Sequence, residues 1–362
     1  MNFIDLSAQQ KLVRENIDLN IKKVLDHGQY IMGPEVFLLE QLLAEYIGVK
    51  HCIGVSSGSD ALLISMMAIG IGPGDEVITT PFTFVSTVEM IALLGAKPVY
   101  VDIDKDTYNI DHKKIEEAIT KKTRLIIPVS LFGQCADMQA INKIASKHNL
   151  PVLEDGAQSL GSSQNGNYSC NLSTIGCTSF FPSKPLGCYG DGGAIFTNDD
   201  EIANLIIKIR NHGQAKRYNH DLLGINGRLD TIQSAILLAK FDIFPQELIA
   251  RNEIGLRYNE LFINTSSRVK IPVTGQGNFH IFSQYSILVE DRDNLAGNLK
   301  NANIPTSIHY PVPIHKQAAF FSDEYKLPIS EFVAKRIISL PMHPYLKQDQ
   351  QEKIVDLCAS VI

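Results

Sequence analysis

The chain has 362 residues, of which 44% are hydrophobic and 20% charged, and its formal net charge is −6. This composition is typical of a globular protein with a large core. It argues against nucleic-acid binding through bulk positive charge, because no block rich in lysine or arginine stands out. The N-terminus lacks the basic and apolar stretches of a signal peptide, and no apolar run is long enough to span a membrane. We therefore expect a cytoplasmic protein. Its six scattered cysteines, none in CxxC spacing, are expected to be reduced and to bind no metal.

The first 250 residues predict a large α/β domain that begins with two helices in residues 1–50. Gly28 is expected to end the first helix and Gly33-Pro34 to open the second. From residue 51, short β-rich runs alternate with helical stretches, which is typical of a mostly parallel sheet with helices on both faces. The expected strands are 51–55, 76–79, 98–103, 124–130 and 151–154, and the expected helices are 59–69, 83–94, 111–119 and 137–148.

The pattern changes near residue 175. Two apolar runs, 175–181 and 193–197, follow each other without a long helix, so we expect two further strands, and this spacing allows one of them to run antiparallel to its neighbours. The chain then predicts a helix at 199–210, a polar loop to 228 and a helical stretch at 229–262 that Pro245 kinks or splits. The remainder predicts a smaller α+β domain, so we divide the chain into domains 1–250 and 251–362.

Two charged residues near expected strand ends carry candidate chemistry. Asp155 follows the strand 151–154, at the edge where open α/β sheets bind ligands, although alone it is better explained as a helix cap. Lys184 lies between two prolines in a stretch with little other charge. A lysine near apolar groups has a lowered pKa and can act as an amine nucleophile, whereas an isolated lysine is usually a solvated surface group.

Two further segments lie at strand ends. Ser56-Ser57-Gly58-Ser59 joins a strand to a helix, and a helix N-terminus with small residues suits phosphate, although serine is also an ordinary helix cap. The aromatic residues of 80–87 fit either stacking on a flat ring or a place in the core. A phosphate cradle, a stacking aromatic, a carboxylate for a ring nitrogen and a nucleophilic lysine are together what pyridoxal 5'-phosphate requires.

Over nearly its whole length the chain resembles the DegT/StrS-type sugar aminotransferases, a branch of the fold-type I pyridoxal phosphate enzymes. Among the segments that carry the resemblance are Gly28-Gln-Tyr-Ile-Met-Gly33-Pro34-Glu35, Ser57-Gly-Ser-Asp-Ala-Leu62, Glu154-Asp-Gly-Ala-Gln-Ser159, Ser179-Phe-Phe-Pro-Ser-Lys184 and Asn226-Gly-Arg-Leu-Asp230. The resemblance implies that Lys184 binds the cofactor covalently and shuttles the proton, and that Asp155 pairs with the pyridinium nitrogen.

The resemblance also implies the remaining cofactor contacts and the assembly. These contacts are Gln158 near the ring hydroxyl, Phe84 on the ring face, and Gly58, Ser59, Ser179 and the neighbouring subunit's Asn226 at the phosphate. The last contact implies a homodimer with shared active sites. The family often has alanine where this chain has Gly156, and we expect the glycine to loosen the turn after the aspartate slightly.

Within the family, the likeness is greatest to members that aminate UDP-2-acetamido-2-deoxy-3-oxo-D-glucuronate for bacterial surface polysaccharide such as O-antigen. It implies a UDP-linked keto-sugar as acceptor and L-glutamate as amino donor. The diphosphate and carboxylate of such a sugar require cations, for which Arg228 is the best candidate; Lys216 and Arg217 fit a solvated loop better. The resemblance places His309 and Tyr310 over the sugar, where the residues alone fit a packed aromatic pair in a turn equally well.

Other functions stay open at this stage. One is an aminotransferase for another UDP- or dTDP-linked sugar, with a 3-keto or 4-keto group. A second is a catalytically silent regulatory protein on the same fold, against which the intact set of Lys184, Asp155 and Gln158 argues. A third is a nicotinamide dehydrogenase, against which the absence of GxGxxG after the first strand argues.

Overall fold

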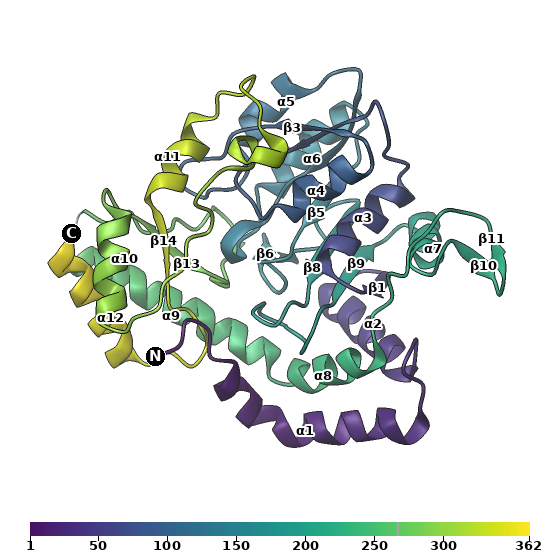
Figure 1. Ribbon diagram of the computed structural model, residues 1–362, viewed down its shortest axis with the longest axis horizontal. Helices are drawn as coiled ribbons and strands as arrows, with labels where there is room; N and C mark the ends of the chain where they lie inside the picture. The colour runs from purple at the N-terminus through teal and green to yellow at the C-terminus, as the bar shows by residue number, and fades with distance from the viewer. Residues whose placement is uncertain (266–267) are drawn as a thin grey trace.

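A mixed sheet forms the centre of the fold (Figure 1). The structure is a computed structural model that describes residues 1–265 and 268–362. Within these residues the strands follow the order β1-β9-β8-β5-β4-β2-β3, because bridges from Ile126 to Val152 and from Val129 to Asp155 join two hydrogen-bonded groups. The strands are β1 (His51–Val55), β2 (Glu76–Thr79), β3 (Lys97–Tyr100), β4 (Thr123–Ile127), β5 (Leu153–Asp155), β8 (Ile175–Ser179) and β9 (Gly193–Thr197).

The strand directions confirm the expected sheet. β2 is parallel to β3 and β4, β5 is parallel to β8, and only β9 runs antiparallel to its neighbours β1 and β8 in the described sheet. Four strands are shorter than predicted, since β3 ends at Tyr100, β4 at Ile127 and β8 at Ser179, and β5 begins only at Leu153. Pro128 follows β4 directly, and proline has no N–H to continue a ladder. The chain nevertheless stays beside β5 past this proline, because the Pro128 carbonyl accepts from the Asp155 N–H at 2.9 Å and the Ser130 N–H donates to the Asp155 carbonyl at 3.0 Å.

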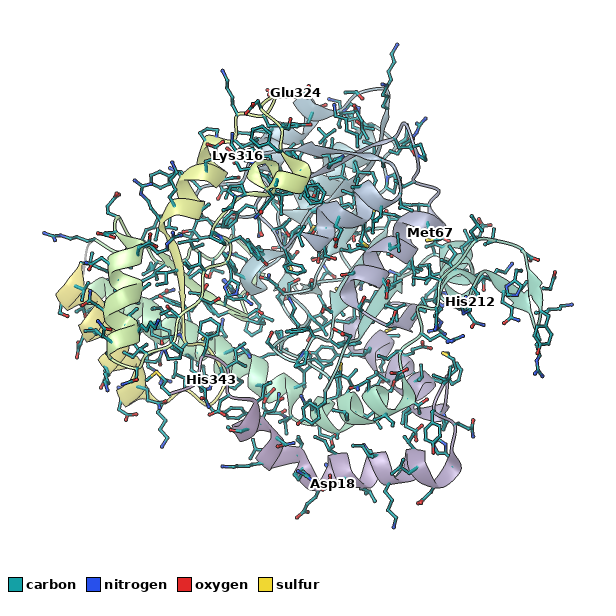
Figure 2. All side chains as sticks on the ribbon, in the orientation of Figure 1. Asp18, Met67, His212, Lys316, Glu324 and His343 are labelled. Atoms are coloured by element: carbon teal, nitrogen blue, oxygen red, sulfur yellow. The ribbon has the colours of Figure 1, made fainter. Side chains whose placement is uncertain are left out.

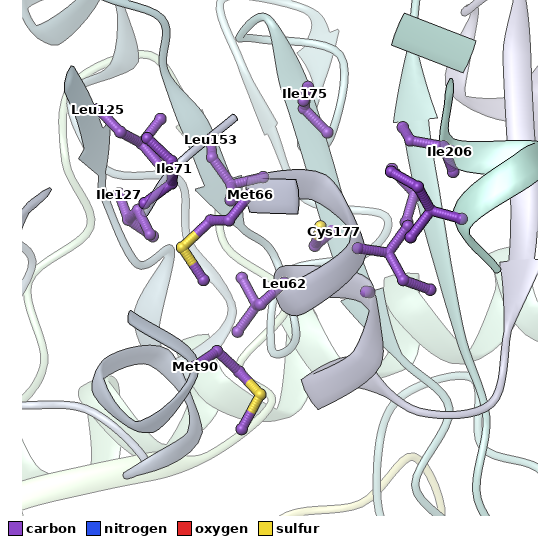
Figure 3. Close-up of a cluster of buried hydrophobic side chains, with 14 of the residues drawn as sticks. Leu62, Met66, Ile71, Met90, Leu125, Ile127, Leu153, Ile175, Cys177 and Ile206 are labelled. Carbon is purple, nitrogen blue, oxygen red and sulfur yellow. The ribbon is translucent and has the colours of Figure 1, made fainter. Parts of the chain in front are cut away.

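Helices cover both faces of the sheet, as the alternation predicts. On one face lie α3 (Gly58–Ala68), α4 (Ser86–Leu93) and α7 (Asp200–Ile209), and on the other lie α2 (Pro34–Ile47), α6 (Met138–Lys147) and α8 (Thr231–Phe241). Side chains of β4 alternate between the faces: Leu125 and Ile127 pack towards α3, whereas Ile126 packs towards α6. Figure 3 shows the core on the α3 side of the sheet, where Met66 lies close to Ile127 and Leu153 of the strands.

The two N-terminal helices begin and end close to where they were predicted. α1 (Leu6–His27) ends at Gly28, which has a φ of 70° and donates its N–H to the carbonyl of Val24. A left-handed residue of this kind closes a helix at low cost when it is glycine. α2 begins at Pro34, where a missing N–H removes no helical bond. α1 then lies along α8 at the bottom of Figure 1.

Several elements differ from the predictions. The stretch 83–94 becomes helical only at Ser86, and 111–119 divides into a 3₁₀ turn η1 (His112–Lys114) and a short α5 (Ile115–Ala118). The stretch 229–262, by contrast, splits near Pro245 as predicted, into α8 and α9 (Phe244–Thr265), with Pro245 in the first turn of α9, where proline is tolerated. The polar loop before residue 228 contains a hairpin of β10 (Gln214–Lys216) and β11 (Asn219–His220), which projects from the body of the molecule (Figure 1).

A second small sheet lies beside the main one. It pairs β6 (Ser163–Gln164) with β7 (Asn167–Tyr168) and with β12 (Asn278–Phe279), so it joins the chain near residue 165 to the C-terminal part. A further 3₁₀ turn, η2 (Leu131–Gly133), follows β4.

The C-terminal part has its own core. Its elements are β13 (Tyr285–Leu288), α10 (Arg292–Asn301), η3 (Ile314–Lys316), η4 (Ala318–Phe320), α11 (Pro328–Arg336), β14 (Ile337–Leu340) and α12 (Gln348–Val361). α9 belongs to two cores, since Phe244 and Leu248 pack beneath the main sheet while Tyr258 and Phe262 pack with the C-terminal elements. The division at residue 250 stays a prediction, and it falls inside this helix. Among the described residues, no helix combines the length and apolar character that crossing a membrane requires.

Candidate active site

Asp155 is the buried carboxylate at the end of β5. Its Oδ2 accepts a hydrogen bond of 2.8 Å from the Thr87 hydroxyl, and its Oδ1 accepts one of 3.2 Å from the Ala157 N–H. Burial raises the pKa of Asp155, while these two donors and the positive charge of Lys184 act in the opposite direction. Because an ionised carboxylate can accept about four hydrogen bonds, Asp155 keeps capacity for another donor, such as a protonated ring nitrogen.

Lys184 lies in the loop that follows β8. Its N–H donates to the Phe181 carbonyl at 2.8 Å, which fixes the backbone, and its side chain is half-buried. Burial lowers the pKa of Lys184 to about 8, and the nearby Asp155 carboxylate limits the shift. The neutral amine is therefore more populated than in an ordinary lysine, as nucleophilic attack on a carbonyl requires. The structure brings the two predicted charged residues into one electrostatic pair.

Gln158 and the C-terminal pair His309-Tyr310 meet beside this lysine and carboxylate. The Gln158 Oε1 accepts from the Phe132 N–H at 2.8 Å, and its Nε2 donates to the Tyr310 hydroxyl at 3.0 Å. A ring nitrogen of His309 lies 2.9 Å from the Ser339 hydroxyl. Burial and the positive charge of Lys184 lower the pKa of His309 to about 4, so its ring is neutral near neutral pH.

The N-terminus of α3 provides a cradle of small residues. Ser57 caps the helix by accepting from the Asp60 N–H at 3.0 Å, and the Ser86 hydroxyl donates to Ser59 at 2.5 Å. A Cβ on Gly58 would lie 2.7 Å from the Cβ of Ser179, so only glycine permits this close approach. The first N–H groups of a helix have no partner within it and suit phosphate. Gly58 is thus in contact with Ser179 and precedes Ser59, and the role of the three residues at a phosphate stays a prediction.

Three other predicted residues lie apart from these contacts within one chain. The Phe84 side chain is 59% exposed, and its ring centre lies 6.5 Å from that of Tyr310. Asn226 is exposed. Arg228 donates from Nη1 to the Asn211 Oδ1 at 2.6 Å, while its buried Nε has no partner. Their roles in stacking, phosphate binding and sugar binding stay predictions.

The sequence prediction missed the support around Asp155. Thr87 is fully buried and donates a hydrogen bond to the Asp155 carboxylate. Its position in the first turn of a helix after a strand is the feature of the sequence that could have indicated this contact. The expected looseness of the turn at Gly156 stays a prediction, but the space beside this glycine is filled. A Cβ there would lie 2.6 Å from the Cys170 Sγ and 3.1 Å from the Cys177 carbonyl oxygen, so the cysteine fills the space that an alanine side chain needs.

Metal ligands do not cluster in the part of the chain that the structure describes. No group of three or more histidine, cysteine, aspartate or glutamate side chains there could hold an ion. All six cysteines are buried and unpaired by disulfides.

A lysine paired with a carboxylate at the strand ends of this sheet, next to a small-residue helix N-terminus, defines the class of fold-type I pyridoxal phosphate enzymes. The model of the DegT/DnrJ/EryC1/StrS aminotransferase family matches residues 11–358, and the chain belongs to this family. It is similar to the UDP-2-acetamido-2-deoxy-3-oxo-D-glucuronate aminotransferase of Pseudomonas aeruginosa, with 54% identity over 346 residues that cover 96% of each protein.

Solved structures agree with this assignment. A DegT/DnrJ/EryC1/StrS aminotransferase from Brucella abortus superimposes with a TM-score of 0.95 at 43% identity, over 99% of both chains. NtdA from Bacillus subtilis, solved with the bound cofactor pyridoxamine phosphate, superimposes with a TM-score of 0.91 at 30% identity, over 99% of this chain and 83% of that one. These relatives confirm the predicted family, the fold type, the aminotransferase class and the pyridoxal phosphate cofactor of that class.

Proposed function

We propose that this chain transfers the amino group of L-glutamate to UDP-2-acetamido-2-deoxy-3-oxo-D-glucuronate, in the synthesis of a bacterial surface polysaccharide. The observation that carries the transaminase chemistry is the Lys184–Asp155 pair, in which burial lowers the pKa of the amine to about 8. The choice of sugar rests on the 54% identity to the Pseudomonas aeruginosa relative.

The described residues fit pyridoxal phosphate. Asp155 has free acceptor capacity for the pyridinium nitrogen, and Lys184 is the amine for the covalent link. Gly58, Ser59 and Ser179 form the phosphate cradle. When bound, the cofactor supplies an electron sink for the carbon whose proton moves. Lys184 holds and returns that proton, and the Asp155 charge keeps the ring nitrogen protonated.

Side chains around the lysine orient the two substrates. Gln158 is fixed between the Phe132 N–H and the Tyr310 hydroxyl, so its amide can direct the cofactor ring hydroxyl without rotating. His309 is neutral, and its Nε2 lies 3.3 Å from the Ser307 hydroxyl, a long contact that a sugar hydroxyl could replace. The Arg228 Nε has no partner but is buried, so binding a carboxylate or phosphate with two parallel hydrogen bonds would require the guanidinium group to move.

We propose further that two copies of the chain form a homodimer with shared active sites. Asn226 is exposed, and Leu223 beside it is 90% exposed, which leaves an apolar side chain without cover in one chain. In the proposed dimer, Asn226 of the neighbouring subunit contacts the phosphate. Mixing Lys184→Ala and Asn226→Asp subunits then restores about a quarter of wild-type activity, because half of the two-fold symmetric dimers are hybrids with one intact site of two. No recovery on mixing would contradict shared sites.

Visible absorbance tests the cofactor link. Wild type incubated with pyridoxal phosphate is expected to show the yellow band of lysine-bound cofactor, which bleaches on adding L-glutamate. The Lys184→Ala variant is expected to lack the band. A wild type that stays colourless would overturn the proposal and favour a binding or regulatory role on the same fold.

A further inference from the structure

The loop that carries Lys184 is held closed by its own backbone. We call residues 180–190 the Lys184 loop. The Cys188 N–H donates to the Phe180 carbonyl at 2.8 Å, so the two ends of the loop meet. Gly187 lies against the opposite arm, since a Cβ there would come within 2.5 Å of the Pro182 carbonyl oxygen. The position of the Lys184 amine therefore depends on this backbone keeping its shape.

A second lysine, Lys240, forms a hydrogen bond with the backbone of the Lys184 loop. Lys240 lies on α8 and is 1% exposed. Its Nζ donates to the Gly187 carbonyl at 2.6 Å and lies 4.2 Å from the centre of the Tyr189 ring, as in a cation–π contact. Both of these partners belong to the Lys184 loop. The ammonium is thus aimed at a backbone carbonyl three residues after the cofactor lysine.

Gln233, another residue of α8, also forms hydrogen bonds with the Lys184 loop. Gln233 precedes Lys240 by two helical turns and therefore lies on the same side of α8. Its Oε1 accepts from the Tyr189 N–H at 2.9 Å, and its Nε2 donates to the Tyr189 carbonyl at 3.3 Å. On another side of the helix, Ile236 and Ala239 pack against α1. α8 thus connects the Lys184 loop to the N-terminal helix.

Burying a lysine is costly, and this one has only partial compensation. Burial lowers the pKa of Lys240 to about 8, and the carboxylate of Glu247 limits the shift. A methionine fills a similar volume without burying a charge. The polar amine is therefore best explained by what it holds, the Gly187 carbonyl.

We infer that Lys240 is a positioning residue that fixes the Lys184 loop through the Gly187 carbonyl and so sets where the Lys184 amine meets the cofactor. The inference rests on the proposed function, because it concerns the lysine that binds pyridoxal phosphate. Lys240 itself is not assigned a contact with cofactor or substrate.

The test compares Lys240→Met, which removes the donor, with Lys240→Arg, which keeps a charged donor, and with Lys353→Met on the exposed face of α12 as control. Hydrogen exchange of the loop amides, with Cys188 as reporter, is measured with and without pyridoxal phosphate. Loss of a charge-assisted hydrogen bond predicts about 10- to 100-fold faster exchange in Lys240→Met. The pH midpoint of the visible cofactor band is expected to shift, because a displaced loop changes the place of the Lys184 amine relative to the Asp155 carboxylate, whose charge acts on the pKa of that amine. Lys240→Arg is expected to recover much of the protection, and the control to behave as wild type.

The outcomes separate the two proposals. A folded Lys240→Met with wild-type loop exchange and an unchanged band midpoint would overturn the inference. If Lys240→Met does not fold, it is replaced by Lys240→Gln, which keeps a neutral donor. If Lys240→Gln does not fold either, Lys240 is required for the stability of the whole protein and the inference is rejected. A wild type that binds no pyridoxal phosphate defeats the proposed function, while exchange without cofactor still decides whether Lys240 holds the loop.

Discussion

The predicted site has two parts that differ in burial. One part lies at the end of β5 and is buried within the chain, and the other lies in the segment 211–228 and is exposed. Asp155 is 6% exposed, and each of its carboxylate oxygens accepts a hydrogen bond from the same chain. Leu223 is 90% exposed, and Asn226 is exposed as well. Figure 2 shows this segment extending beyond His212, away from the body of the protein.

This difference in burial separates the residues that set the reactivity of Lys184 from those expected to bind a second subunit or the substrate. The charges that set the reactivity of Lys184 come from one chain, because Asp155 and the burial of the amine account for its pKa. The predicted contacts of Asn226 and Arg228 need a surface or a ligand that one chain does not supply. We therefore expect substitutions at the end of β5 to change chemistry, and substitutions in 211–228 to change assembly and substrate binding.

Replacing Lys184 with alanine is expected to have the largest effect. The variant loses both the covalent attachment and the proton carrier, so turnover should fall by about 10⁴-fold or more. The matched control, Lys353→Ala on the exposed face of α12, should keep wild-type turnover. Steady-state rates of amino-sugar formation measure both, and substantial turnover in Lys184→Ala would contradict the assigned role.

Asp155→Asn is expected to lower turnover by about 10²–10³-fold, because the ring nitrogen loses its ionised partner. The carboxylate also raises the pKa of Lys184, so its removal should move that pKa below about 8. In protein freed of cofactor, the pH dependence of Lys184 modification should shift to lower pH. A shift to higher pH would mean that the charge interaction is misassigned, and thermal unfolding checks that the isosteric variant is folded.

Leu223→Asp tests whether the exposed segment 211–228 lies at the interface between two subunits. If the side chain is buried between two subunits, the substitution should weaken self-association by about 1.5–3 kcal/mol, measured by sedimentation. Ile263→Asp, at another exposed apolar position that is 70% accessible, serves as control and should not change the association. Equal effects of the two substitutions would remove the segment 211–228 from the proposed interface.

Gly156→Ala tests how tightly the chain packs behind Asp155. The new Cβ meets the Cys170 Sγ, so unfolding free energy should fall by about 1–3 kcal/mol. Cys170→Ala in the same protein should recover part of the loss, whereas Cys170→Ala alone should be destabilising. If the two substitutions are additive in chemical denaturation, the sulfur atom is not the obstacle.

The sequence predicts the main sheet because its strands are apolar, regularly spaced and bounded by turn residues. It fails for β6, β7 and β12, whose two residues each carry no periodic signal and whose pairing joins distant segments. Strand ends depend on single residues such as Pro128, whose effect is clear only when the neighbouring strand is known.

In the candidate site too, the sequence does not indicate contacts between residues that are far apart along the chain. Lys184 and Asp155 are visible as unusual charges beside apolar runs, and their role follows from the resemblance. The contact of Gln158 with Tyr310 joins residues 152 positions apart, and spacing cannot indicate it. Lys240 offered a weak signal, a charge within the apolar stretch of α8, but its partner Gly187 appears only when the helix packs on the loop.

The identity of the sugar is tested most directly by product analysis. The protein, loaded with pyridoxal phosphate, is incubated with nitrogen-labelled L-glutamate and UDP-2-acetamido-2-deoxy-3-oxo-D-glucuronate, and the product is examined by NMR. The account predicts labelled nitrogen bound to carbon 3 of the UDP-linked sugar and release of 2-oxoglutarate in equal amount. No labelled UDP-sugar, together with amination of a dTDP-linked or 4-keto sugar by the same preparation, would contradict it.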